Sequence, residues 1–193
     1  MKIEKVYVAG PMFNCKEIEE LLEIGRVLDN AGYQTFVPPR DGFVYSEIVK
    51  KIQDEHNFSA EDANRISLKL VAYLDIYMIC NVCDACVVNL NGRVPDEGTV
   101  VEAAICFRSE RPLVLYKNDS RSLINGKDSP MILGLAGFKV TKSIEDIPRM
   151  LKELESLNTS EYQKIMRNAS KIFENYDSDR GLGDLIKLGI CLL

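Results

Sequence analysis

The feature of the sequence that most constrains the fold is an alternation of short apolar segments with longer segments of helical periodicity. Lys5–Ala9 is typical of a β-strand that ends at Gly10, and between Lys16 and Asn30 the apolar residues recur at helical spacing. A second short strand follows at Gln34–Val37 and ends at two prolines. This order predicts a βαβ unit, in which the helix connects two parallel strands.

The alternation continues over the rest of the chain. Further strands are expected at Ala85–Leu90, Pro112–Tyr116 and Phe138–Thr141, and further helices at Ser59–Asn81 and Thr99–Arg108. Residues 40–58 are expected to form an irregular loop, or a loop with a short helix of its own, and residues from about 143 to 175 a helical C-terminal extension. We therefore expect a single domain over residues 1–193, with a mostly parallel five-stranded sheet and helices on both faces.

The net charge and the lengths of the apolar segments indicate which kinds of partner the chain can bind. A formal net charge of −5 gives the chain no basic field for a nucleic-acid backbone, so a small molecule is the expected partner. The first residues pass directly into a strand without the apolar region of a signal peptide, and no apolar stretch approaches the about 20 residues of a membrane span. We expect a cytoplasmic protein that binds neither nucleic acid polymers nor membranes.

The six cysteines are expected to be reduced thiols, since most of them lie inside apolar segments. Cys80, Cys83 and Cys86 have a CxxCxxC spacing that superficially resembles metal ligation. A fourth ligand is not evident, and the only histidine, His56, is distant in the sequence. We therefore expect no bound metal.

In open parallel sheets, ligands bind beyond the carboxyl ends of the strands. The loops Gly10–Phe13, Pro38–Phe43 and Asn91–Gly98 are therefore expected to converge on a site. The chain has neither a GxGxxG sequence nor a Walker loop, which disfavours NAD and ATP. We expect no organic cofactor.

Glu102 is the first candidate for chemistry. It lies in a predicted helix whose other residues are small or apolar, and on a helical wheel it shares a face with Gly98, Thr99 and Cys106. The small side chains around Glu102 leave room for a substrate to approach its carboxylate. The helix dipole is expected to hold this carboxylate ionised, as a nucleophile must be. The alternative is an ordinary first-turn glutamate that the dipole stabilises.

Asp75, Asp96 and Tyr7 are further candidates, each with a structural alternative. Asp75 lies in an apolar stripe of the preceding helix, where burial would raise the pKa of its carboxyl group and let it donate a proton near neutral pH; the alternative is a capped or exposed aspartate. Asp96 stands just before a helix, in the place of an N-cap. Tyr7 lies late in the first strand, where its hydroxyl could reach the sheet edge or its ring could fill the core.

Three segments, taken in order, resemble the nucleoside 2-deoxyribosyltransferase family. They are Tyr7-Val8-Ala9-Gly10-Pro11, Asp84-Ala85-Cys86-Val87-Val88-Asn89-Leu90 and Pro95-Asp96-Glu97-Gly98-Thr99-Val100-Val101-Glu102, and the match covers roughly residues 3–140. The Asp-x-Gly-Thr-x-x-Glu element is the most specific part. The resemblance implies a flavodoxin-like (Rossmann-like), doubly wound fold and a retaining double displacement, in which Glu102 attacks C1′ of a deoxyribose.

The resemblance also implies roles for other residues. Tyr7 would lie near the nucleophile and Asp96 beside the substrate. Asp75 would contact the base and deliver a proton, but its spacing to Asp96 is one residue longer than in some members, so the proton donor is either Asp75 or Asp96. Ser129-Pro130-Met131 stands in the place of an Asn-Pro-Met segment with which a neighbouring subunit completes the sugar 5′ site. This implies that Ser129 and Met131 bind substrate in a homo-oligomer of at least two copies. The substrate-binding candidates from the loops are Gly10, Pro11, Met12, Phe13 and Gly98.

The expected function is transfer of the sugar of a 2′-deoxynucleoside to a free nucleobase. Related 2′-deoxynucleoside 5′-monophosphate N-glycosidases hold the phosphate with a loop richer in glycine, serine and arginine than residues 10–14, which favours a nucleoside here. Met12, Phe13, Phe43 and Tyr45 are expected to wall the pocket against water. The alternatives are a hydrolase on the same scaffold and a non-catalytic nucleotide-binding module.

Overall fold

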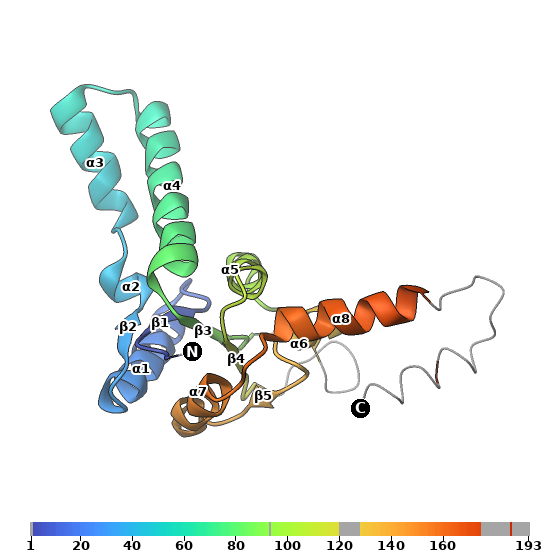
Figure 1. Ribbon diagram of the computed structural model, residues 1–193. Helices are drawn as coiled ribbons and strands as arrows, with labels where there is room; N and C mark the ends of the chain where they lie inside the picture. Colours follow the sequence, from blue (N-terminus) through green and yellow to red (C-terminus); the bar gives the residue numbers. More distant parts are fainter. Residues whose placement is uncertain (1, 93, 120–127, 175–185, 187–193) are drawn as a thin grey trace.

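The computed structural model describes residues 2–92, 94–119, 128–174 and 186 (Figure 1). The described strands form one sheet in the order β2-β1-β3-β4-β5, and every neighbouring pair is parallel. They are β1 (Lys5–Ala9), β2 (Gln34–Phe36), β3 (Ala85–Asn89), β4 (Leu113–Tyr116) and β5 (Val140–Thr141). This is the strand order of a flavodoxin-like, doubly wound fold, so the expected fold class is confirmed.

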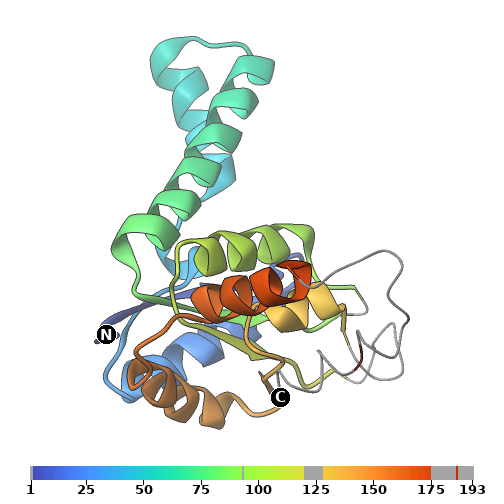
Figure 2. The same cartoon turned by 45° about the vertical axis from the view of Figure 1, so that its right-hand side comes forward.

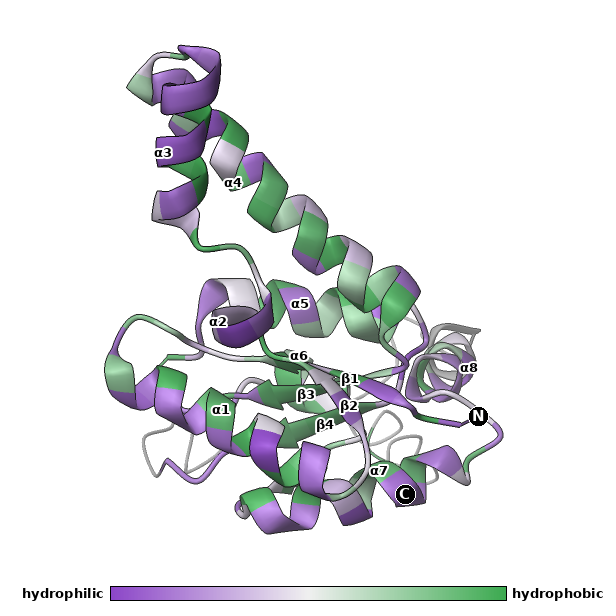
Figure 3. Cartoon of the chain, turned by 90° about the vertical axis from the view of Figure 1, so that its left-hand side faces the viewer, coloured by the Kyte–Doolittle hydropathy of each residue, from purple (hydrophilic) through white to green (hydrophobic). Residues whose placement is uncertain are grey.

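Helices cover both faces of the sheet, because successive strand residues point to opposite sides. Val6 and Val8 of β1 face a core built with α1 (Cys15–Asn30) and α7 (Ile147–Glu155). Tyr7 and Ala9 face a second core, built with α5 (Glu97–Arg108) and the π-helical turn η1 (Met78–Val82). Figure 3 shows α1 and α7 on one side of the sheet and α5 on the other.

The C-terminal region is helical, as expected, but it is interrupted. A short 3₁₀ turn η2 (Ile144–Asp146) leads into α7, whose Ile147 and Leu151 are fully buried against the sheet. Next comes α8 (Glu161–Glu174), which packs on α5 through an edge-to-face contact between Tyr162 and Phe107 (Figure 2). The first half of this region is therefore part of the layer that covers the sheet. The apolar C-terminal tail lies outside the described residues, apart from Ile186.

Of the two structures expected for residues 40–58, the loop with a helix of its own is closer to the observed one, but the helical part is longer than expected. The segment forms α2 (Pro38–Asp41) and α3 (Tyr45–His56), which ends at Asn57 in a left-handed conformation. It pairs with α4 (Ala60–Tyr77), and the two helices project from the sheet as a hairpin (Figure 1). The helix α3 is polar over most of its surface and buries Ile52 against its neighbour, so tertiary packing decides its structure.

Two smaller boundaries also differ from the expected ones. The helix that carries Glu102 begins at Glu97 instead of Thr99, because Asp96 caps it. The strand β5 begins at Val140, since Phe138 has a left-handed backbone with φ of 63°. Within the described ranges, no helix combines the length and the apolar character needed to cross a bilayer.

Candidate active site

The site is built around a buried tyrosine in the middle of β1. The strand pairs with β2 and β3 on its two sides, which places Tyr7 beside Phe36 and Cys86. The ring of Tyr7 is fully buried and stacks on that of Phe36 at 5.5 Å between centroids. Its hydroxyl donates a hydrogen bond of 2.6 Å to Oε1 of Glu102. Tyr7 is therefore both a core aromatic and a partner of the candidate nucleophile.

Glu102 is presented by α5, whose start is fixed by Asp96. Oδ2 of Asp96 accepts hydrogen bonds from the backbone N of Thr99 at 2.7 Å and from its Oγ1 at 2.8 Å. Thr99, Ala103 and Cys106 are buried against the sheet. Glu102 lies on the flank of this buried face, so its carboxyl group is largely covered while one side of the helix stays open.

The expectation that the helix dipole holds Glu102 ionised meets an opposing effect, because burial of the carboxyl group favours its protonated form. The pKa of this carboxyl group is raised to about 7; burial is the largest cause, and the negative charges of Asp75 and Asp96 contribute smaller increases. The hydrogen bond from Tyr7 acts in the opposite direction. Near neutral pH, Glu102 is therefore balanced between its protonated and ionised forms.

Asp75 joins the same group from a third element. It lies in the last turn of α4, just before the π-helical turn η1, and it is close enough to the Tyr7 hydroxyl for the two groups to shift each other's pKa. Burial raises the pKa of Asp75, as its apolar neighbours predicted, although Leu68 of that stripe is itself exposed. π-helical turns occur frequently at functional sites, so the turn that follows Asp75 is in keeping with a functional role for this end of α4.

Tyr7, Asp75 and Glu102 can take different roles in acid–base chemistry, because their surroundings affect their pKa values differently. Burial, followed by the charges of Glu102 and Asp75, raises the pKa of Tyr7 far above its usual value, so its hydroxyl stays protonated and acts as a donor. The two carboxyl groups meet at that hydroxyl and influence each other's charge. One carboxylate and one carboxylic acid can thus coexist in the site near neutral pH.

The loop after β1 lies at the carboxyl edge of the sheet. Gly10 and Pro11 are buried, and a side chain at Gly10 would meet Leu21 Cδ2 at 2.5 Å and Asn89 Cβ at 2.9 Å. Met12 and Phe13 are exposed, as are Phe43 and Tyr45. Gly98 is also exposed, beside the carboxylate of Asp96. None of the four side chains expected to wall a pocket is buried in the single chain.

A polar network that the sequence analysis does not predict joins α1 to the ends of β3 and β4 and to the two loops that follow these strands. The carboxylate of Glu20 on α1 accepts hydrogen bonds from the amides of Asn89 and Asn91, both at 2.7 Å, and from Tyr116 at 3.1 Å. Oδ1 of Asn91 accepts from the backbone N of Asn118 at 3.0 Å. The recurrence of asparagine directly after β3 and β4 is the sequence signal that could have pointed to this network.

Ser129 and Met131 lie at the start of a short helix after β4. The hydroxyl of Ser129 caps α6 (Pro130–Gly134) by accepting from the backbone N of Met131 at 3.3 Å, and the Met131 side chain is 81% exposed. A buried ion pair of 2.5 Å between Asp128 and Lys117 anchors this segment to the end of β4. In the described part of the chain, no hydrogen bond joins Ser129 or Met131 to Tyr7, Asp75 or Glu102.

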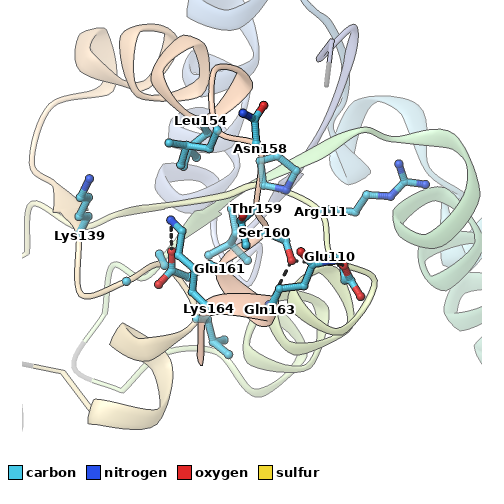
Figure 4. Close-up of a pocket in the computed structure, with 16 residues that line it drawn as sticks. Glu110, Arg111, Lys139, Leu154, Asn158, Thr159, Ser160, Glu161, Gln163 and Lys164 are labelled. Atoms are coloured by element: carbon cyan, nitrogen blue, oxygen red, sulfur yellow. Dashed lines mark hydrogen bonds and ion pairs between the residues drawn. The ribbon is translucent and has the colours of Figure 1, made fainter. Parts of the chain in front are cut away.

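A cavity of about 420 Å³ lies elsewhere, at the amino ends of β4 and β5 (Figure 4). Its walls include Arg111, Lys139 and the start of α8, where Lys164 pairs with Glu161 at 3.2 Å. It contains none of the candidate site residues, so its size does not make it the active site.

The described cysteines are free thiols, and Cys83 and Cys86 are buried in the core beneath α5. The described His, Cys, Asp and Glu side chains form no group of three or more that could hold a metal ion.

Comparison with known proteins gives one family and several similar folds. The family model described as nucleoside 2-deoxyribosyltransferase matches residues 6–178. A conserved protein from Enterococcus faecalis V583 is similar in structure, with a TM-score of 0.56 and 19% identity over 79% of this chain and 99% of that chain. A 2-deoxyribosyltransferase from Bacillus psychrosaccharolyticus has a TM-score of 0.49 and 17% identity, over 75% and 90% of the two chains. A CMP N-glycosidase from Clostridium botulinum has a TM-score of 0.44 and 14% identity, over 77% and 99%. No curated protein sequence matches the chain.

Proposed function

Because the chain belongs to the nucleoside 2-deoxyribosyltransferase family, we propose that it cleaves the N-glycosidic bond of a 2′-deoxynucleoside and transfers the sugar to another nucleobase. The observation that carries the proposal is the meeting of Glu102 and Asp75 at the hydroxyl of Tyr7. A nucleophilic carboxylate beside a carboxylic acid is the pair that retaining glycoside chemistry requires.

In the first step, the Glu102 carboxylate attacks C1′ of the deoxyribose. The bond from C1′ to the base nitrogen breaks, its electron pair goes to the base, and Asp75 supplies the proton that the leaving base takes up. The product is a deoxyribosyl ester of Glu102. The hydroxyl of Tyr7 orients the attacking carboxylate and lowers its pKa, which favours the ionised form.

In the second step, a nitrogen of the acceptor base attacks C1′ and Glu102 leaves as a carboxylate. The acceptor base returns a proton to Asp75, which restores the starting state. Each displacement inverts C1′, so the configuration of the nucleoside is retained.

The start of α1 supports a nucleoside over a 5′-monophosphate. Oδ1 of Asn14 accepts from the backbone N of Lys16 and Glu17, and the Glu17 carboxylate accepts from the backbone N of Phe13 at 2.8 Å. These donors would otherwise be the natural site for a phosphate at a helix N-terminus. The amide oxygen of Asn14 and the carboxylate of Glu17 already accept from these donors, which leaves them unavailable to a phosphate.

The test is base exchange by the purified chain. Given deoxyinosine and free adenine, the chain should form deoxyadenosine, and given deoxyinosine alone it should release little deoxyribose; both products are measured by chromatography. Base-independent release of deoxyribose would favour the hydrolase. Faster reaction of a 5′-monophosphate than of the nucleoside would contradict the substrate assignment.

A matched pair of variants on α5 tests the nucleophile. Glu102→Ala should abolish exchange, while Glu97→Ala, which removes an exposed acidic residue of the first turn, should leave it intact. Exchange at the wild-type rate by Glu102→Ala would overturn the mechanism. Loss of exchange together with retained base binding separates a transferase from a non-catalytic binding module.

A further inference from the structure

Glu20 of α1 is the common acceptor in the polar network at the carboxyl edge of the sheet. Its Oε2 accepts a hydrogen bond from the amide of Asn89 at 2.7 Å. Its Oε1 accepts from the amide of Asn91 at 2.7 Å and from the hydroxyl of Tyr116 at 3.1 Å. All three donors are neutral, and a hydrogen bond to an ionised acceptor is about twice as strong as one between neutral groups. One carboxylate therefore holds three side chains at or just after the ends of β3 and β4.

The hydrogen bonds continue from these donors into the loops after β3 and β4. Asn89 is fully buried, and its Oδ1 accepts from the backbone N of Asn91 at 2.9 Å. Oδ1 of Asn91 accepts in turn from the backbone N of Asn118 and of Asp119, both at 3.0 Å. Satisfied polar networks of this kind rigidify the segments that they join.

The network also reaches the loop after β1, where the substrate-binding candidates Gly10–Phe13 lie. Asn89 packs against the backbone of Gly10, since a side chain at Gly10 would come within 2.9 Å of Asn89 Cβ. The loop then turns into α1, which begins at Cys15 and carries Glu20. The hydrogen bond between Glu20 and Asn89 therefore links both ends of this loop to the end of β3.

A cleft of about 380 Å³ lies at the same edge of the sheet. Residues of α1 line one part of it, and the loops after β3 and β4 line the rest; the lining includes Asn14, Glu17, Glu20, Asn91 and Asn118. Open parallel sheets bind their ligands at the carboxyl ends of the strands. The hydrogen bond from Asn91 to Glu20 joins the two parts of the lining, so it sets how far apart they stand.

We propose that Glu20 is a positioning residue, which holds the loop Gly10–Phe13 against the ends of β3 and β4 in the arrangement that binds the substrate. This role rests on the proposed function, because the loop contains the candidates for contact with the deoxynucleoside. The network lies on the α1 side of the sheet, where Tyr116 is part of the core, whereas Tyr7 faces the opposite core and α5 (Figure 3). Glu20 therefore acts on substrate binding and leaves the groups that carry out the displacement unchanged.

Glu20→Gln tests this role by replacing one carboxylate oxygen with an amide nitrogen. In either orientation of the new amide, its N–H groups face the amide N–H groups of Asn89 or of Asn91, and the hydrogen bond between them is lost. KM for the deoxynucleoside should rise at least about 10-fold, with kcat nearly unchanged. Loss of folded protein alone would lower the apparent kcat and leave KM as it is, so the two constants separate positioning from stability. The same change at an exposed neighbour, Glu19→Gln, is the control and should leave both constants at wild-type values.

Asn89→Asp supplies the complementary change. When it is combined with Glu20→Gln, the amide at position 20 donates to the carboxylate at position 89, whose other oxygen should still accept from the backbone N of Asn91. The hydrogen bond is restored with donor and acceptor exchanged, so KM should return to within about threefold of the wild-type value. Asn89→Asp alone places two carboxylates together and should raise KM by itself.

Hydrogen–deuterium exchange measures the same hydrogen bonds without any reaction. The backbone N–H groups of Asn91, Asn118 and Asp119 donate to side chains of the network. They should take up deuterium at least about 10-fold faster in Glu20→Gln than in the wild type, and the double variant should recover their protection.

A Glu20→Gln variant with the wild-type KM would overturn the positioning role, and so would a double variant no better than Glu20→Gln. A wild type that transfers no base would contradict the proposed function alone, since faster deuterium uptake in Glu20→Gln would still show that this carboxylate holds the loops.

Discussion

The hydroxyl of Tyr7 donates a 2.6 Å hydrogen bond to Oε1 of Glu102, joining two residues that lie 95 positions apart in the chain. The bond links the middle of a buried strand to an early turn of a covering helix. It lowers the pKa of Glu102 against the effect of burial, and it therefore increases the ionised fraction of the carboxyl group near neutral pH.

Tyr7→Phe removes this bond and should raise the pKa of Glu102. A hydrogen bond to a charged group contributes about 1.5–3 kcal/mol, so kcat/KM near neutral pH should fall roughly 10- to 100-fold, with a smaller deficit in alkaline buffer. The pH profile of kcat/KM measures this. The control is Tyr33→Phe, because the buried hydroxyl of Tyr33 has no hydrogen-bond partner among the described residues. A profile of unchanged shape in Tyr7→Phe would contradict the assigned role.

The wild-type pH profile should be bell-shaped. The reactive form carries one proton on the two carboxyl groups, with Asp75 protonated and Glu102 ionised. The highest pKa of the pair is the value of about 7 given for Glu102, so the last proton leaves the pair near that pH. Above it, kcat/KM should fall. At acid pH a second proton binds, and kcat/KM should fall again. Activity that keeps rising well above pH 7 would show that no proton donor of this pair limits the reaction.

Asp75→Asn removes the proton donor and also a negative charge that raises the pKa of Glu102. Transfer from a natural deoxynucleoside should fall by roughly 100-fold or more, whereas a nitrophenyl deoxyriboside, whose leaving group needs no proton, should lose much less. With that substrate, the ascending limb of the pH profile should move to lower pH. Equal losses with both substrates would remove Asp75 from the proton-donor role.

Glu102→Gln should stabilise the fold in alkaline buffer while abolishing exchange. Folding raises the pKa of Glu102 from 4.5 to about 7, so its stabilising contribution is complete below pH 4.5 and is lost as the pH rises through 7. The loss is at most about 3 kcal/mol. Thermal unfolding should therefore give the variant the higher Tm above pH 7 and similar Tm values for both proteins below pH 4.5. A variant that is less stable at alkaline pH would contradict the burial of this charge.

Gly10→Ala should destabilise the protein by about 1–3 kcal/mol, since the added methyl group has to displace Leu21 and Asn89 at the carboxyl end of β1. Gly134→Ala is the matched control, because an added methyl group there meets nothing within 4 Å. Urea unfolding of both variants gives the comparison. Equal stability of the two would mean that the loop after β1 adjusts freely.

Much of the fold could be predicted because its signals are local. Strands such as Ala85–Asn89 are continuous apolar runs, and their alternation with helical periods is sufficient to predict a parallel sheet with two covered faces. The hairpin was missed because α3 is polar on average, and Ile52, its buried residue, gains a partner only when α4 packs beside it. A contact between two helices leaves little trace in the sequence of either one.

The candidate site likewise has a part that local sequence predicts and a part that only the packing of distant segments creates. The fold class and the candidate Glu102 could be predicted from the order of residues alone, because the segment from Asp96 to Glu102 is contiguous and its capping and spacing are local properties. Only the tertiary structure brought Tyr7, Asp75 and Glu102 together from a strand and two helices. It also decided the pKa of Glu102, because desolvation depends on what packs around a carboxyl group, and the chain order does not contain that information.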